Sequence, residues 1–130
     1  EFSNFSNHSI YVDGINWLTA EHYYQAQKFI EPELKEKIRL TETPTLAKVT
    51  ATEMNNLRRA DWAEIKEDVM LKALRGKFRQ HPELAKLLLS TVEKRIVEST
   101  SNDRFWGESL DGIGQNMLGE LLMLVRTELE

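Results

Sequence analysis

The 130-residue sequence contains no cysteine, and only three prolines and six glycines. The absence of cysteine excludes a disulfide scaffold, a thiolate zinc site and a cysteine nucleophile. No apolar run approaches the ~18 residues that a membrane-spanning helix needs, and the polar, aromatic start of the sequence is unlike a signal peptide. We therefore expect no membrane association and a cytoplasmic location.

Positive charge is not in excess. The chain carries 17 basic and 21 acidic side chains, a formal net charge of −4 and a pI of about 5.5. General binders of nucleic acid or anionic membranes normally present a basic face, so this balance argues against both. With 41% apolar and 29% charged residues, the composition is typical of a globular protein. The length indicates a single domain over residues 1–130.

The pattern of apolar residues predicts a small sheet and several helices. Residues 10–12 and 15–17 flank Asp13-Gly14, a dipeptide typical of a tight hairpin turn. Helices are expected over residues 20–30, 34–40, 45–55, 62–78, 82–88 and 117–125, with Thr19 and Thr43 as N-caps. A short strand is expected at Ile96-Val97 and a loop over residues 99–114. The predicted fold class is α+β, mostly helical with a small sheet.

The first helix places an acid, an amide and an amine on one face. At 100° per residue, Glu21, Gln25 and Lys28 fall within about 60° of one another, and Tyr24 borders them. Spacing alone favours a solvated helix surface with an acid–base pair over a functional site.

Two other segments combine aromatic and charged residues. In residues 58–62, Trp62 could stack on a flat base beside an arginine that holds a phosphate, or it could anchor its helix to the core. Residues 98–107 form either a site loop or a structural turn. The three histidines, at positions 8, 22 and 81, lack the spacing of metal ligands and are expected at the surface or at helix caps. We expect neither a metal nor a cofactor.

Short motifs along nearly the whole chain resemble those of the NADAR, or YbiA-like, family. They are E-F-S-N-F at 1–5, E-H-Y-Y-Q-A-x-K-F at 21–29, R-x-D-W at 59–62, V-M at 69–70, K-F at 77–78, V-E at 97–98, D-R-F-W-G at 103–107 and G-x-N-x-L-G-x-L-L-M-x-V-R at 114–126. Each motif is short, but their common order is specific. The resemblance implies an α+β N-glycosidase that cleaves the bond between ribose C1′ and an exocyclic amine.

The resemblance also implies substrates. The first class is the phosphoribosylamino-pyrimidine intermediates of riboflavin biosynthesis. One alternative is ADP-ribose attached to guanine in nucleic acid, and another is a non-hydrolytic module that binds ADP-ribose or a nucleotide. The acidic pI disfavours long nucleic acid, because phosphate neutralisation supplies most non-specific affinity. A small ribosyl-amine or ADP-ribosyl molecule is therefore the expected partner.

The family motifs imply a set of site residues. Those implied as catalytic are Glu21, Lys28 and Asp103. Those implied in substrate binding are Asn4, Tyr24, Arg59, Trp62, Trp106, Gly107 and Asn116. A carboxylate can stabilise positive charge at C1′ or activate water, and an acid can protonate the leaving amine. Lys28 offers a second route, a Schiff base with a ring-opened aminoribose, and the sequence leaves both routes open.

Overall fold

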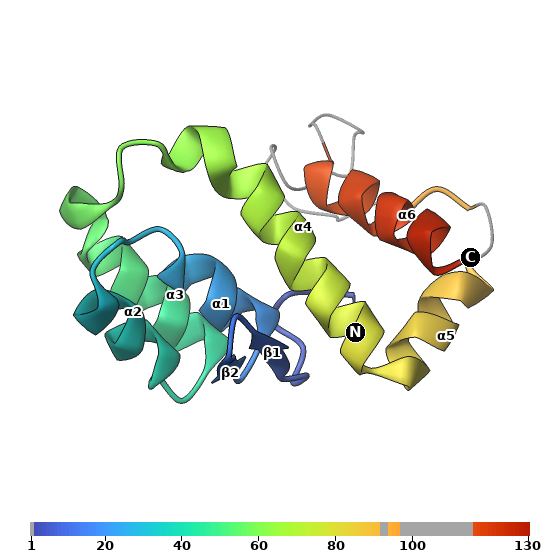
Figure 1. The fold of residues 1–130 in the computed structure, drawn as a ribbon, viewed down its shortest axis with the longest axis horizontal. Helices are drawn as coiled ribbons and strands as arrows, with labels where there is room; N and C mark the ends of the chain where they lie inside the picture. The colour runs from blue at the N-terminus through green and yellow to red at the C-terminus, as the bar shows by residue number, and fades with distance from the viewer. Residues whose placement is uncertain (1, 92–93, 97–115) are drawn as a thin grey trace. The chain divides into compact units, whose positions relative to one another are not determined.

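The computed structural model describes residues 2–91, 94–96 and 116–130, which belong to two compact units (Figure 1). The first unit, Glu1–Gln80, holds β1 (Ile10–Val12), β2 (Ile15–Trp17), α1 (Ala20–Ala26), α2 (Pro32–Arg39), α3 (Pro44–Glu53), the short 3-10 helix η1 (Asn55–Leu57) and α4 (Trp62–Gln80). The second unit, His81–Glu130, holds α5 (Pro82–Ser90) and α6 (Met117–Leu129). The predicted α+β class, mostly helical with a small sheet, is confirmed.

The hairpin forms where the sequence predicts it. Strands β1 and β2 are antiparallel, with Ile10 opposite Trp17. Asp13 and Gly14 have φ angles of 54° and 81°. Both angles are positive, as the tight turn of a two-residue hairpin requires.

The strand expected at Ile96-Val97 is not seen at Ile96, which has no regular secondary structure. The Ile96 carbonyl accepts a hydrogen bond from the Asn116 side-chain amide at 2.9 Å, where a strand would use a backbone partner. Val97 and the predicted loop at residues 99–114 lie outside the described residues.

The helix starts follow the expected capping chemistry. Thr19 Oγ1 accepts from the His22 backbone N–H at 3.1 Å, and Thr43 Oγ1 accepts from Leu46 N–H at the same distance. The three prolines of the chain all lie in the first turn of a helix, where a missing N–H costs nothing: Pro32, Pro44 and Pro82.

Helix α1 ends at Ala26, earlier than the predicted end at about Ile30. After Gln27, two backbone amides turn back on the helix, since Lys28 N–H bonds to Gln25 O and Phe29 N–H to Ala26 O. This turn buries Phe29 completely in the core and leaves Ile30 exposed. Tertiary burial of one aromatic ring therefore shortens the helix and places Lys28 in its terminal turn.

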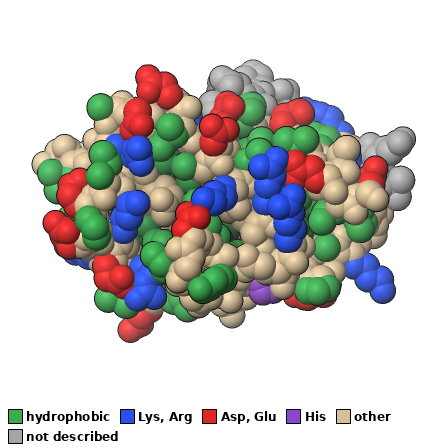
Figure 2. Space-filling model, viewed as in Figure 1, with side chains coloured by type: hydrophobic (Ala, Val, Ile, Leu, Met, Phe, Trp, Pro, Cys, Tyr) green, Lys and Arg blue, Asp and Glu red, His purple; other side chains and the backbone are tan. Residues whose placement is uncertain are grey.

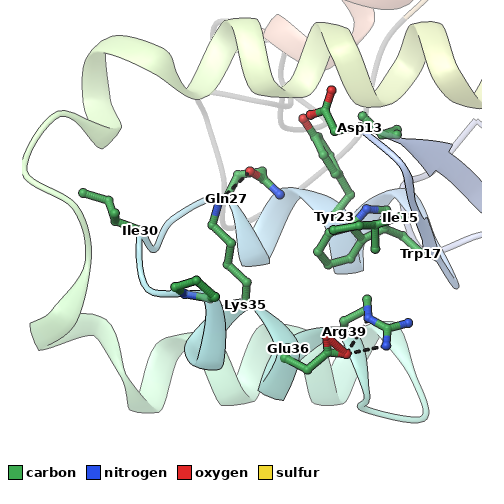
Figure 3. A pocket seen from close by; sticks show the side chains of 11 residues that line it. Asp13, Ile15, Trp17, Tyr23, Gln27, Ile30, Lys35, Glu36 and Arg39 are labelled. Carbon is green, nitrogen blue, oxygen red and sulfur yellow. Dashed lines mark hydrogen bonds and ion pairs between the residues drawn. The ribbon is translucent and has the colours of Figure 1, made fainter.

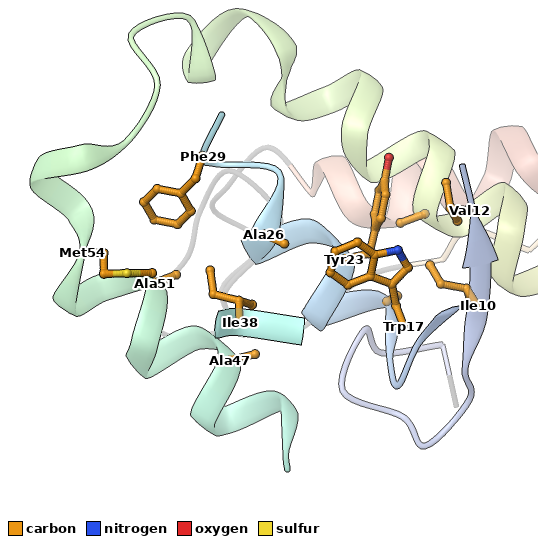
Figure 4. Packing of buried hydrophobic residues seen from close by; sticks show 12 residues of the cluster. Ile10, Val12, Trp17, Tyr23, Ala26, Phe29, Ile38, Ala47, Ala51 and Met54 are labelled. Carbon is orange, nitrogen blue, oxygen red and sulfur yellow. The ribbon is translucent and has the colours of Figure 1, made fainter. Parts of the chain in front are cut away.

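The core of the first unit surrounds α1 (Figure 4). Trp17 and Tyr23 meet edge to face, with 5.7 Å between ring centroids. Small residues such as Ala26 and Ala47 lie at the helix interfaces and let the backbones approach closely. Because α2, α3, α4 and β2 all contact α1, every residue from Ala20 to Ala26 is buried.

The second unit pairs α5 with α6. Its buried apolar side chains lie at helical spacing, as the sequence predicts: Leu84, Leu88, Leu118, Leu121, Leu122 and Val125. Near the end of α6, the Arg126 guanidinium donates to Thr91 Oγ1 and to Lys94 O, each at 2.7 Å. In the described part of the chain, no helix combines the length and apolar character needed to cross a membrane.

Candidate active site

The polar face of α1 is buried. Glu21 is 6% exposed and Gln25 is 3% exposed, so the reading of this face as a solvated surface is wrong. The reason is tertiary, because α2, α3, α4 and β2 all contact α1. Burying a carboxyl group is costly unless polar partners surround it, so the neighbours of Glu21 are the natural place to look for a site.

Glu21 is held by one hydrogen bond to its side chain and one from its backbone. Gln25 Nε2, one helical turn away, donates to Glu21 Oε2 at 2.6 Å. The Glu21 backbone N–H donates to the Asn4 carbonyl at 3.1 Å. The buried Asn4 side chain in turn donates from Nδ2 to Met70 Sδ of α4 at 2.9 Å. These contacts attach the N-terminal segment to α1 and α4.

The environment raises the pKa of Glu21. Burial is the largest cause and favours the neutral acid. The hydrogen bond from Gln25, the charges of Lys28 and Lys48, and the Asn4 amide act in the opposite direction without cancelling it. A carboxyl group with a raised pKa retains its proton at higher pH, which suits it to donate a proton.

Lys28 lies beside two aromatic rings. Its Nζ atom is 5.8 Å from the ring centroid of Tyr24 and 6.0 Å from that of Trp62. Both distances are within the range of cation–π attraction. Because Tyr24 belongs to α1 and Trp62 to α4, the amine lies where these two helices meet.

Arg59 is already occupied by a carboxylate. Its Nε and Nη2 atoms donate to the two carboxylate oxygens of Asp61, at 2.6 and 3.1 Å. This hydrogen bonding holds the pKa of Asp61 below its ordinary value. The Arg59 backbone N–H donates to the Lys28 carbonyl at 2.8 Å, so Arg59 also ties the end of α1 to the start of α4. A phosphate at Arg59 would have to share the guanidinium with Asp61.

The structure brings five of the predicted site residues into one cluster. They come from the N-terminal segment, α1 and its terminal turn, and α4: Asn4, Glu21, Tyr24, Lys28 and Trp62. Asn116 belongs to the second unit, where it is buried and precedes α6 with a positive φ of 49°. Asp103, Trp106 and Gly107 lie outside the described residues.

Three residues that act on Glu21 or on its partner Asn4 were not among the predicted site residues. Gln25 shares the helix face of Glu21, and that spacing is the signal that could have found it. Met70 belongs to a two-residue family motif, but its contact with Asn4 spans 66 positions. Lys48 is exposed on α3 and reaches Glu21 only through its charge, so no sequence pattern marks it.

His22 has a structural role. Its two ring nitrogens lie 2.8 Å from Thr19 Oγ1 and 3.0 Å from the Thr41 carbonyl. The carbonyl fixes Nε2 as the donor, so Nδ1 accepts from the Thr19 hydroxyl. Burial lowers the pKa of His22 and favours this neutral ring. His22 is therefore neither at the surface nor itself a cap, contrary to the expectation: it is fully buried within α1, and its ring bonds the N-cap residue Thr19.

A separate cavity of about 310 Å³ opens on the other side of α1 (Figure 3). Its described lining includes Trp17 and Tyr23 but none of the predicted site residues. Its charged groups have partners, since Arg39 pairs with Glu36. Burial and the charge of Asp13 raise the pKa of Tyr23 to about 12. The cavity therefore lies apart from the cluster of predicted site residues around Glu21.

The fold and the cluster define a small α+β protein in which the buried carboxyl group of Glu21 lies near the amine of Lys28, and this amine lies beside two aromatic rings. The NADAR domain family matches residues 1–130, and the chain belongs to this family. The resemblance inferred from the sequence motifs is thereby confirmed.

Three comparisons give the family context. The chain is 46% identical over 129 residues to the N-glycosidase YbiA of Escherichia coli (strain K12), covering 99% of this chain and 81% of that protein. It is 42% identical over 128 residues to the riboflavin biosynthesis protein VVA0006 of Vibrio vulnificus, covering 98% of this chain and 35% of that protein. The NMR structure of E. coli YbiA superposes with a TM-score of 0.90 at 47% identity, covering 98% of this chain and 76% of that one.

Proposed function

We propose that this chain is an N-glycosidase that hydrolyses the bond between ribose C1′ and an exocyclic amine. The observation that carries the proposal is the buried Glu21, with its raised pKa, beside Lys28. Membership of the NADAR family and the N-glycosidase names of its relatives support the same reaction class.

Glu21 is the proton donor in this proposal. As the C1′–N bond breaks, its electron pair moves onto the amine nitrogen, which takes the proton from Glu21. Water then adds its hydroxyl group to C1′ and returns a proton to the carboxylate. Burial keeps this carboxyl group protonated to a higher pH than an exposed one, so that a proton is available for general acid catalysis.

Two nucleophiles are compatible with the cluster. In the first route, water attacks C1′ directly. In the second, the neutral amine of Lys28 adds to C1′ of the ring-opened imine and expels the exocyclic amine. Water then hydrolyses the lysine imine and releases the sugar aldehyde, so both routes consume one water molecule.

The remaining site residues keep the roles that the family motifs imply. We propose that Asp103 stabilises positive charge at C1′, and that Asp103→Asn lowers kcat by roughly 10²-fold or more. Trp106, Gly107 and Asn116 are proposed to bind substrate. A near-normal turnover of the Asp103→Asn variant would remove Asp103 from the mechanism.

The proposed substrate is a phosphoribosylamino-pyrimidine of riboflavin biosynthesis. The name of the Vibrio vulnificus relative supports this choice. The net charge of −4 argues against long nucleic acid as the alternative substrate, and Figure 2 shows acidic and basic side chains interspersed over the face that it draws. On α4, Lys72 is paired with Asp13 at 2.8 Å. A cytoplasmic location remains part of the proposal.

The test is incubation with both substrate classes, followed by mass spectrometry of the products. We expect ribose 5-phosphate from the pyrimidine substrate and little ADP-ribose from ADP-ribosylated guanosine. Glu21→Gln should lower the rate by at least ~10²-fold, the lower end of general acid catalysis. Glu33→Gln, an exposed change on α2, is the matched control. Release of ADP-ribose alone would overturn the substrate, and release of neither product would overturn the function.

A further inference from the structure

Two buried amide oxygens beside Glu21 have no hydrogen-bond partner among the described residues. They are Asn4 Oδ1 and Gln25 Oε1. The one other such atom in that part of the chain is Trp17 Nε1. Both amides act on the same carboxyl group, Gln25 through its 2.6 Å bond and Asn4 through a weaker hydrogen-bonding effect on the Glu21 pKa.

Buried amide oxygens of this kind are expected to accept a hydrogen bond. A buried acceptor without a partner is unfavourable, and buried polar groups in native proteins are nearly always paired. The orientation of Gln25 is set by the bond from Nε2 to Glu21, which leaves Oε1 on the other side of the amide. The site therefore presents two neutral acceptors next to its acid.

We propose that Gln25 is a substrate-binding and positioning residue of this site. Its Oε1 accepts a hydrogen bond from the 2′ hydroxyl group of the ribose, and Asn4 Oδ1 accepts one from the 3′ hydroxyl group, while the Gln25 Nε2 holds Glu21 at C1′. The inference rests on the proposed function, because it takes a ribosyl substrate as given.

The ribose diol fits the acceptor pair for two reasons. Its two vicinal hydroxyl groups are both donors, and the 2′ hydroxyl is bonded to the carbon next to C1′, where Glu21 acts. In glycoside hydrolysis, hydrogen bonds to the 2-hydroxyl strengthen as the transition state forms. An uncharged amide can make such a bond without placing a second negative charge beside Glu21.

The positioning role is separable from diol binding. Among the described residues, the charged groups whose fields reach Glu21 are Lys28, in the terminal turn of α1, and Lys48, on α3. Gln25 adds a directed hydrogen bond to the carboxylate. Removing that bond raises the Glu21 pKa further, so activity that depends on protonated Glu21 persists to higher pH.

The experiment compares Gln25→Met with Gln27→Met. Methionine has nearly the shape of glutamine without its polar atoms. Gln27 directly follows α1 and lines the cavity on the other side of that helix, so it is the matched control. Each enzyme is assayed with the ribosyl, 2′-deoxyribosyl and 3′-deoxyribosyl forms of the pyrimidine substrate, and the pH dependence of kcat is recorded.

We expect Gln25→Met to lower kcat/KM for the ribosyl substrate roughly tenfold or more, the loss of about one hydrogen bond. At a pH where Glu21 is protonated in both enzymes, the 2′-deoxy substrate should be slow with the wild type and hardly slower with Gln25→Met, because both changes remove the same bond. The 3′-deoxy change should cost the same factor in both enzymes, because it removes the bond to Asn4 instead. The basic limb of the pH profile should move to higher pH in Gln25→Met alone. Gln27→Met should match the wild type.

The proposal is overturned if the wild type cleaves the 2′-deoxy and ribosyl substrates equally well, a result that needs no variant to fold. It is also overturned if the fall in kcat/KM for Gln25→Met acting on the 2′-deoxy substrate equals the product of the falls caused by each change alone. If no ribosyl substrate is cleaved, the proposed function fails by itself. Calorimetry with ribose 5-phosphate and 2-deoxyribose 5-phosphate then tests Gln25 directly, and equal affinities would overturn its role.

Discussion

The rings of Tyr24 and Trp62 meet edge to face, with 5.1 Å between their centroids and 65° between their planes. This contact joins α1 to the first residue of α4. Trp62 is only 4% exposed, so it offers little free ring surface for a flat base to stack on. The anchoring role of Trp62 is therefore the stronger of the two roles considered from the sequence.

Trp62→Ala should destabilise the protein and disturb Lys28. Removing a buried tryptophan costs about 3–5 kcal/mol, which lowers the Tm of a protein this size by roughly 10 °C or more. Trp62→Phe keeps a ring against Tyr24 and should recover most of that loss. Thermal melting and substrate affinity are measured for both variants. Weaker binding by Trp62→Ala at an unchanged Tm would instead identify Trp62 as a base-stacking platform.

Lys28→Arg separates the two proposed nucleophiles. Arginine keeps the positive charge beside Tyr24 and Trp62, but its pKa above ~12 denies it a neutral amine. If Lys28 forms an imine, the variant folds normally and loses turnover. Borohydride added during turnover should then leave a sugar-sized mass on the wild-type peptide that contains Lys28.

The control for this experiment is Lys37→Arg, an exposed change on α2. It should keep full activity and the same trapped adduct on Lys28. An active Lys28→Arg enzyme, together with no adduct on the wild type, would assign the attack on C1′ to water.

Local chemistry made parts of the fold predictable. Asp13-Gly14 adopts the positive φ angles that its hairpin requires, and Thr19 and Thr43 cap their helices. Each of these features depends on residues within three positions of one another. The three prolines likewise mark helix starts through their own geometry.

The features of the fold that could not be predicted depend on contacts between residues far apart in the sequence. The polar face of α1 has the spacing of a surface helix, and only its coverage by other elements buries it. The early end of α1 depends on the burial of Phe29 and on the bond from Arg59 N–H to the Lys28 carbonyl. Sequence spacing placed Gln25 beside Glu21, but the unpartnered oxygen of Gln25 is visible only in three dimensions.

Glu21→Gln should stabilise the protein at neutral pH. The pKa of Glu21 is raised in the folded state, so the native protein binds more protons than the unfolded chain above about pH 4.5. Burying the ionised form therefore costs stability at pH 7, and this cost disappears as the pH falls below the unfolded value. We expect Glu21→Gln to have a higher Tm than the wild type at pH 7 and nearly the same Tm at pH 4.

Thermal melting of the wild type, Glu21→Gln and Glu33→Gln across this pH range checks the prediction. The exposed Glu33 change should leave Tm unaltered. A lower Tm for Glu21→Gln at pH 7 would mean that the ionised carboxylate stabilises the fold, contrary to the direction of its pKa.

Gly119→Ala should destabilise the second unit, although alanine is normally the better helix residue. A Cβ atom at Gly119 would overlap the Ile96 carbonyl oxygen and the Asn116 side-chain amide, which are hydrogen-bonded to each other. Breaking that bond to the buried Asn116 side chain costs about 1–3 kcal/mol, more than the ~1 kcal/mol that alanine gains over glycine in a helix.

Gly76→Ala in α4 is the matched control for this change. Its Cβ would lie 3.5 Å from the nearest atoms of Gln80 and Val12, an ordinary contact, so this variant should gain about 0.5–1 kcal/mol. Urea denaturation gives both free energies of unfolding, and hydrogen exchange reports the protection of α6. If Gly119→Ala were as stable as Gly76→Ala and kept α6 protected, the close packing of Gly119 against Ile96 and Asn116 would not hold in solution.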